Sequence, residues 1–330
     1  MKVDELRTAL NQYDAAVLKE IIVMLYKKIP KSRKEDEGLD ELLLHFSKEK
    51  KPAVKKETVV DFDALQFDVE QFLEYADEQY YLAPNRYVRK EKRSKWRFEV
   101  RRFIKELQTV GGEDNEAAAL LLADIYAMLS YACSYWVFSS EDPFLPVGYK
   151  QPDLLRLVLA KIFSGGYNEA TIKTAVFLTL DSNVDRETLH HELLDILAAQ
   201  LQTPDTKELA MAQCIAYQKE YIAYQSAKQL FRYTDGIQYR KTRHSNYAVE
   251  LYSMLKFSLH EYDEGIDYFL KNYSERNKEV TLYCLLCYFL SDDELSSLWI
   301  REYERAVADG IEPRDSLRKE YAERKTKSQT

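Results

Sequence analysis

The chain has 330 residues, a formal net charge of −8 and nine glycines, where average usage of about 7% would give roughly 23. Sheets and phosphate loops need glycine at their turns, so this shortage argues against all-β and dinucleotide-binding folds and favours helices joined by short loops. No G-x-G-x-x-G, G-x-x-x-x-G-K or G-x-S-x-G sequence occurs, which argues against phosphate-loop and nucleophile-elbow enzymes.

The start of the chain and its apolar runs bear on the cellular compartment. The first residues, MKVDELRTALNQYD, are charged and lack the apolar core of a signal peptide. No uncharged apolar run reaches the length of about 20 residues that a bilayer span needs. The four cysteines each lie in an apolar helical pattern, which is typical of reduced core thiols. We therefore expect a cytoplasmic protein that does not enter the membrane.

The first predicted element is a small helical module over residues 1–46. Asp14 predicts a helix cap, apolar residues follow at spacings of three and four as far as Leu25, and Pro30 ends the helix. Residues 47–58 are rich in lysine, contain a proline and have no apolar stripe. This composition predicts a linker.

A charged helical hairpin is predicted over residues 59–110. Residues 61–78 carry seven carboxylates and no basic residue, whereas residues 86–105 carry ten Lys or Arg against two Glu. A basic helix of this density can neutralise several phosphates, but it can also pair with the acidic helix or with another protein, and the sequence leaves these alternatives open. The candidate phosphate- or nucleic-acid-binding residues are Arg89, Lys90, Lys92, Arg93, Lys95 and Arg97.

Residues 113–325 show helical patterns one after another, separated by short loops. Helix starts are predicted at Tyr167–Asn168 and at Val184–Asp185, where a capping side chain follows an apolar one. Short loops place successive helices antiparallel and adjacent. The sequence therefore predicts an all-α fold, an irregular antiparallel helical-hairpin array of the α-solenoid kind that follows the small N-terminal module.

One helical pair of this array, residues 246–273, has a distinctive pattern. Tyr252 and Ser253 stand at a large and a small position of its first helix, and Gly265 and Phe269 stand at a small and an aromatic position of its second. This pattern resembles a tetratricopeptide unit. The resemblance implies a helical-repeat architecture that binds its partner on a concave surface.

Tyrosine is enriched, with 25 residues in the chain. A tyrosine joins a large apolar ring to a hydroxyl group, so it suits both half-buried seams between helices and binding surfaces. Either packing between helices or a groove for an extended peptide or a single-stranded nucleic acid is consistent with the enrichment. The candidate partner-binding residues are Tyr217, Tyr221, Tyr224, Phe231 and Tyr252.

Two clusters resemble metal sites but lack the required ligands. Cys284 and Cys287 lie inside an apolar helical pattern without a second cysteine pair, so we interpret them as core residues. His191 and Asp195 lie one turn apart, but the second histidine of an H-E-x-x-H site is absent. We therefore predict no metal, no cofactor and no catalytic residue.

Taken together, these patterns predict a function in binding. We expect a non-enzymatic protein–protein interaction scaffold of the helical-repeat type, which docks a protein partner. The alternative is a nucleic-acid-associated protein that binds phosphates through residues 86–105.

Overall fold

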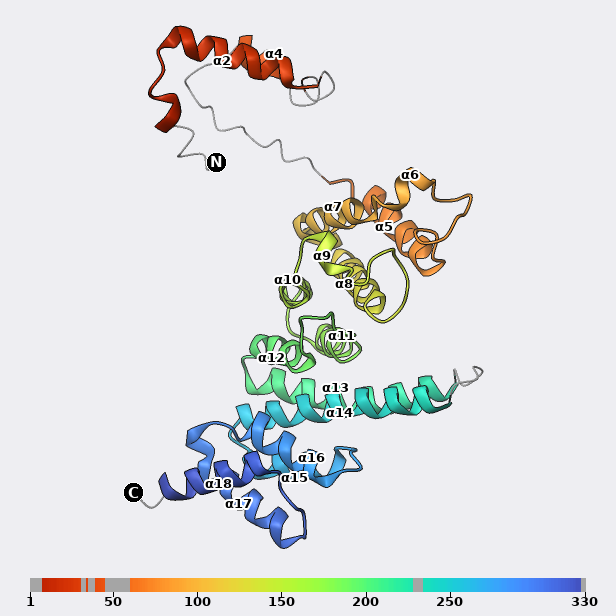
Figure 1. Ribbon diagram of the computed structural model, residues 1–330. Coiled ribbons are helices and arrows are strands. Elements are labelled where there is room, and N and C mark those ends of the chain that lie inside the picture. Colours follow the sequence, from red (N-terminus) through yellow and green to blue (C-terminus); the bar gives the residue numbers. More distant parts are fainter. Residues whose placement is uncertain (1–7, 31–33, 35–38, 45–59, 228–233, 328–330) are drawn as a thin grey trace. The chain divides into compact units, whose positions relative to one another are not determined.

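The computed structural model describes residues 8–30, 34, 39–44, 60–227 and 234–327 (Figure 1). Helices make up 74% of the structure, and the described residues contain no strand. The all-α prediction is therefore confirmed, whereas the finer prediction of an α-solenoid-like array stays a prediction. No helix within the described ranges is long and apolar enough to cross a membrane.

The chain divides into two units at Val59–Val60, and the smaller unit holds the N-terminal helices. These are α2 (Ala15–Lys28) and α4 (Leu39–Leu44). Helix α2 begins at the predicted cap, because the Asp14 carboxylate accepts a hydrogen bond from the Val17 N–H at 2.9 Å. The predicted linker, residues 47–58, lies outside the described residues.

The larger unit holds the remaining helices. In chain order they are α5 (Phe62–Asp77), α6 (Lys90–Arg93), α7 (Trp96–Thr109), η1 (Gly112–Asp114), α8 (Asn115–Ala132), α9 (Phe144–Val147), α10 (Gln151–Phe163), α11 (Glu169–Leu180), α12 (His190–Gln200), α13 (Pro204–Ala227), α14 (Thr234–Ser258), α15 (Tyr262–Asn272), α16 (Lys278–Cys284), η2 (Leu285–Phe289), η3 (Asp293–Leu295), α17 (Ser296–Ala308) and α18 (Asp315–Lys327). Helices close in sequence pack on one another: α7 on α8, α8 on α10, α11 on α13, α13 on α14 and α14 on α15.

Two apolar cores run through the larger unit and share helix α14. The first extends from α5 to α14 and includes Leu251 and Leu255, and the second extends from α14 to α18 and includes Val249. Helix α14 therefore contributes one side to each core. Because apolar residues of α14 are buried on both of its sides, they do not gather on a single face of the helix.

The residues of the predicted charged hairpin form α5, α6 and α7. Helices α5 and α7 pack through their apolar faces, where the rings of Phe72 and Phe103 meet edge to face at 5.6 Å. The prediction of one continuous basic helix over residues 86–105 is wrong, because residues 86–89 form a loop and a turn at Ser94–Lys95 separates α6 from α7.

The two helix starts predicted within residues 113–325 had different outcomes. Asn168 caps α11 as predicted, with its side-chain oxygen accepting from the Thr171 N–H at 3.0 Å. The start at Val184–Asp185 is wrong, since the Asp185 carboxylate instead closes a turn by accepting from the Thr188 N–H at 2.7 Å. Helix α12 begins only at His190.

The helical pair over residues 246–273 comprises the end of α14 and all of α15. A β-carbon at Gly265 would lie 2.6 Å from a ring carbon of Phe257, so any larger residue here would force the Phe257 ring to move. This agrees with the small residue expected at that position, and the tetratricopeptide resemblance itself stays a prediction.

Candidate functional site

The basic segment, residues 86–105, starts from a loop that one asparagine holds in place. The Asn85 side-chain amide donates to the carbonyl oxygens of Tyr80 at 2.6 Å and Ala83 at 2.7 Å. Its side-chain oxygen accepts from the N–H groups of Tyr87 at 2.9 Å and Val88 at 2.7 Å. All hydrogen-bonding capacity of this side chain is thus used to close the loop, which fixes the backbone on both sides of it.

Two arginines of the basic segment hold the backbone of the fold. Arg93 donates through Nε to the Val88 carbonyl oxygen at 3.0 Å and through Nη2 to the Asn85 carbonyl oxygen at 3.3 Å. Arg101 donates through Nε to the carbonyl oxygen of Val147 at 2.9 Å. Arg93 was a candidate phosphate ligand, and the structure engages its guanidinium with the loop.

A third arginine joins the basic segment to the acidic helix. Arg102 lies 2.8 Å from the Asp68 carboxylate on α5 and 3.1 Å from Glu106 on its own helix. Within residues 60–109, all of which the structure describes, no other ion pair connects the basic segment to α5. Among the described residues, ion pairing therefore accounts for one cation of the ten.

The other cations of the basic segment form no ion pair with a described carboxylate. Six of these seven cations are exposed to solvent, and the seventh, Arg97, is half-buried. Two of them contact rings: the Arg86 guanidinium lies over Tyr87 and the Arg97 guanidinium over Phe98, at 5.2 and 4.8 Å. These seven cations are Arg86, Arg89, Lys90, Lys92, Lys95, Arg97 and Lys105.

Tyrosine rings gather beside these cations. The rings of Tyr80 and Tyr87 are parallel, with centroids 4.6 Å apart and 8° between their planes, and Tyr75 lies near both. The Tyr87 side chain is 49% exposed. An exposed, stacked ring next to cations that pair with no described carboxylate can receive a flat ligand that carries negative charge.

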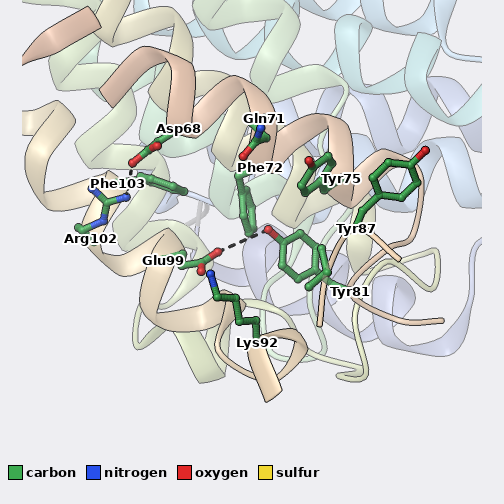
Figure 2. A pocket seen from close by; sticks show the side chains of 11 residues that line it. Asp68, Gln71, Phe72, Tyr75, Tyr81, Tyr87, Lys92, Glu99, Arg102 and Phe103 are labelled. Atoms are coloured by element: carbon green, nitrogen blue, oxygen red, sulfur yellow. Dashed lines mark hydrogen bonds and ion pairs between the residues drawn. The ribbon is translucent and has the colours of Figure 1, made fainter. Parts of the chain in front are cut away.

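A pocket of about 310 Å³ opens between α5, the loop and α6–α7 (Figure 2). Figure 2 shows Tyr75 and Tyr87 at one end of this pocket and the pair Arg102–Asp68 at the other. Between them the Tyr81 hydroxyl donates to Glu99 at 3.4 Å, and burial raises the pKa of Tyr81. The lining residues are Asp68, Gln71, Phe72, Tyr75, Tyr81, Tyr87, Val88, Lys92, Glu99, Arg102 and Phe103.

The tyrosines that the sequence suggested for partner binding lie elsewhere. Tyr217 is 3% exposed, and its hydroxyl donates to Asp181 at 3.3 Å, so its ring belongs to the core. Tyr252 is half-buried against the parallel ring of Tyr268, at 3.7 Å. The side chains of Tyr221 and Tyr224 and the whole of Phe231 lie outside the described residues.

The four cysteines and His190 are at least partly buried among packed side chains. Burial raises the pKa of all four cysteine thiols, that of Cys133 to about 12, so these sulfurs are weak nucleophiles and weak metal ligands at neutral pH. His190 is buried against the ring of Tyr247, and burial lowers its pKa. In the part of the chain that the structure describes, no three His, Cys, Asp or Glu side chains are placed to hold a metal ion.

No protein-family model, curated protein or solved structure matches the chain. The site therefore has to be interpreted from its own chemistry.

Sequence reasoning found the cations of the site but not its rings or its loop. Tyr80, Tyr87 and Asn85 were not singled out, although the stretch YYLAPNRY (residues 80–87) carried a usable signal. Its Pro-Asn pair predicts a turn, and tyrosines on either side of a turn are placed to meet. The pocket residues Gln71 and Glu99 gave no signal, since they become neighbours only when α5 packs on α7.

Proposed function

We propose that this chain is a non-enzymatic, cytoplasmic, nucleic-acid-associated protein that binds phosphate groups through the basic segment. The observation that supports this most is the set of seven cations without an ion pair to a described carboxylate, next to a helix that carries acidic residues. Cations left at the surface can meet phosphates, and each such contact releases counterions from the nucleic acid.

The charge of the whole chain supports the same proposal. The net charge is −8, whereas the basic segment carries ten Lys or Arg against two Glu. A polyanion is repelled by most of the surface and attracted at one place, so its approach is directed to the basic segment. The attraction falls within a Debye length of about 10 Å at 0.1 M salt, which makes binding strongly dependent on salt.

Replacing the four exposed cations around α6 with glutamine tests the proposal. Each phosphate contact contributes about 0.9 unit to the slope of log affinity against log salt on duplex DNA, so we expect the loss of four contacts to make the slope shallower by about 3.6 units. Fluorescence anisotropy with labelled DNA over a series of salt concentrations measures it. The variant carries Arg89→Gln, Lys90→Gln, Lys92→Gln and Lys95→Gln.

A matched variant removes the same charge from exposed cations on α15, α16, α18 and the loop before α16. It carries Lys271→Gln, Arg276→Gln, Lys278→Gln and Lys319→Gln. This control should keep the wild-type salt slope. An equal loss in both variants, or no binding by the wild type at about 50 mM salt, where phosphate contacts are strong, would refute the proposal.

A second function, docking of a protein partner on an α-solenoid-like array, is supported by a different surface. A pocket of about 300 Å³ lies beside Trp136, whose side chain is 59% exposed. An exposed tryptophan at a pocket is typical of a binding hot spot. We expect the wild-type chain to capture a protein from a host lysate even after nuclease treatment. The variant Trp136→Ala should no longer capture it. Capture that is unchanged in the variant would contradict this second proposal.

A further inference from the structure

The loop of residues 80–88 carries the Tyr87 ring on a backbone that other side chains hold in place. Asn85 and Arg93 hold the loop by bonds to backbone groups of Tyr80, Ala83, Tyr87 and Val88. None of these bonds uses the phenol ring of Tyr87. The ring is therefore presented by a rigid backbone, which lowers the entropic cost of binding a ligand against it.

We propose that the pocket beside Tyr87 receives one unpaired base of a single-stranded nucleic acid, with Tyr87 as its stacking ring. This inference rests on the proposed function, since the cations of the same segment would hold the phosphates. It adds the class of nucleic acid and the residue that distinguishes it.

The size of the pocket favours a single base. At about 310 Å³ it lies at the lower end of the range for small-molecule sites, about 300–1,000 Å³. A base in a duplex is covered by its neighbours and its pairing partner, so it cannot enter a pocket without leaving the stack. Unpaired bases already expose their faces and edges.

The lining residues suit both the base and the phosphate of a nucleotide. The rings of Tyr75 and Tyr87 form the aromatic end of the pocket, and Lys92 and Arg102 supply positive charge (Figure 2). The Glu99 carboxylate accepts hydrogen bonds, which suits the amino group of cytosine or adenine. Rings, an acceptor and cations within one pocket match a base with its phosphate better than they match an acidic peptide, which would use the cations alone.

The contact between Arg86 and Tyr87 does not prevent stacking. The guanidinium lies 5.2 Å from the ring centroid and donates through Nη2 to the Tyr87 hydroxyl at 3.1 Å, and both residues are exposed. An exposed cation–π contact is weaker than base–aromatic stacking, so a base can displace the guanidinium. Once displaced, Arg86 becomes another cation for the phosphate backbone.

The test compares labelled single strands of about 20 deoxycytidines with abasic strands of the same length and charge. We expect the wild-type chain to bind the base-bearing strand about tenfold more tightly than the abasic strand, and Tyr87→Ala to abolish that preference. Tyr87→Phe keeps the ring and should keep the preference. Thermal melting by circular dichroism should be nearly unchanged in both variants.

The matched control is Tyr167, an exposed tyrosine on another part of the same unit. It is 47% exposed and stacks on Phe163 with centroids 4.5 Å apart, close to the 49% and 4.6 Å of Tyr87 on Tyr80. None of the described cations lies over its ring, so Tyr167→Ala should bind both strands like the wild type. A loss equal to that of Tyr87→Ala would overturn the inference.

The remaining outcomes separate this inference from the function on which it rests. If the wild type binds base-bearing and abasic strands equally and with a steep salt dependence, phosphate binding stands and the base pocket is refuted. If it binds neither strand at about 50 mM salt, both are refuted. If a polyglutamate peptide displaces the base-bearing strand as efficiently as an equal charge of unlabelled strand, the occupant is an acidic protein segment and the inference is overturned.

Discussion

The basic segment and the C-terminal helices, α15 to α18, are both rich in arginine and lysine, but these cations form different contacts in the two regions. In the C-terminal helices, Arg301 lies 2.6 Å from Asp263 on α15, and Lys325 pairs with Glu304 on α17. In the basic segment, Arg102 pairs with Asp68, and most of the other cations have no described carboxylate within reach. The number of cations in a segment therefore does not determine how many of them are paired.

The position of the carboxylates explains the difference. The faces of α5 and α7 that meet are apolar, for example Val69 and Phe103, so most carboxylates of α5 lie on its exposed sides, away from α7. In the C-terminal helices, carboxylates such as Glu302 lie within the packed seam itself. Cations therefore form ion pairs where carboxylates lie in the interface between helices. They remain available for a ligand where apolar residues alone fill that interface.

The largest effect on stability is expected at Arg324, the most buried cation of the C-terminal group. Its side chain is 8% exposed, and it donates to the Ser291 carbonyl oxygen and the Ser296 hydroxyl, each at 2.7 Å. Arg324→Leu removes two charge-assisted, part-buried hydrogen bonds, so we expect the free energy of unfolding to fall by about 3 kcal/mol. Urea denaturation measures the change.

Arg318 on the same helix is the control for Arg324. It is about half exposed and pairs with Glu312 at 2.9 Å, so Arg318→Leu should cost less than about 1 kcal/mol. Equal losses in the two variants would mean that burial does not separate structural cations from surface ones, and the comparison between the two regions would fail.

An intermediate effect, which depends on pH, is expected at Glu250 on α14. Burial raises the pKa of this carboxyl to about 7, against an ordinary value of 4.5, while the Tyr273 hydroxyl donates to it. A raised pKa means that the folded state holds the proton more tightly than the unfolded state does. The stability that the protonated Glu250 carboxyl contributes is therefore complete below about pH 4.5 and is lost as the pH rises through about 7.

Glu250→Gln should remove this dependence. One pKa unit corresponds to about 1.4 kcal/mol, and partial exposure reduces the effect, so we expect the variant to be about 2 kcal/mol more stable than the wild type near pH 8. Near pH 4 the two should be alike. Urea denaturation across this pH range measures it, with Glu323→Gln on the exposed side of α18 as the unchanged control. A variant that gains nothing at high pH would show that the carboxylate is well solvated.

Much of the fold could be predicted because its signals are local. Glycine shortage and apolar spacing indicate helices regardless of what packs on them, and the Asn168 cap forms within its own helix. The start predicted at Asp185 failed because tertiary contacts decide it: its N–H donates to the Gln151 side chain on α10, and its carboxylate closes a turn. The sequence therefore predicted that this helix exists, but not the residue at which it begins.

The candidate site could be predicted only in part, for the same reason. The density of cations is a property of the sequence, but whether Arg93 faces a ligand or the loop depends on where the Val88 carbonyl oxygen lies. Tyr217 was a candidate partner-binding residue, but its ring packs edge to face against Phe177. A sequence shows which side chains are present, whereas availability depends on the packing of neighbouring helices.

The smallest effect is expected at the one pair that joins the two charged helices, Arg102 and Asp68. Both side chains are nearly half exposed, so the pair gains little from a low dielectric. A double-mutant cycle with Arg102→Gln and Asp68→Asn should give a coupling energy below about 1 kcal/mol. The coupling should disappear toward 1 M salt, where the Debye length is about 3 Å.

The cycle also tests which use of the basic segment dominates. A coupling above about 2 kcal/mol that survives high salt would make the pair a structural strut and would favour internal pairing over phosphate binding. A weak coupling leaves α5 and α7 held by their apolar seam, as the contact of Phe72 with Phe103 indicates. In that case Asp68→Asn should also bind DNA slightly more tightly than the wild type, because it removes a carboxylate from the edge of the pocket and frees Arg102 for a phosphate.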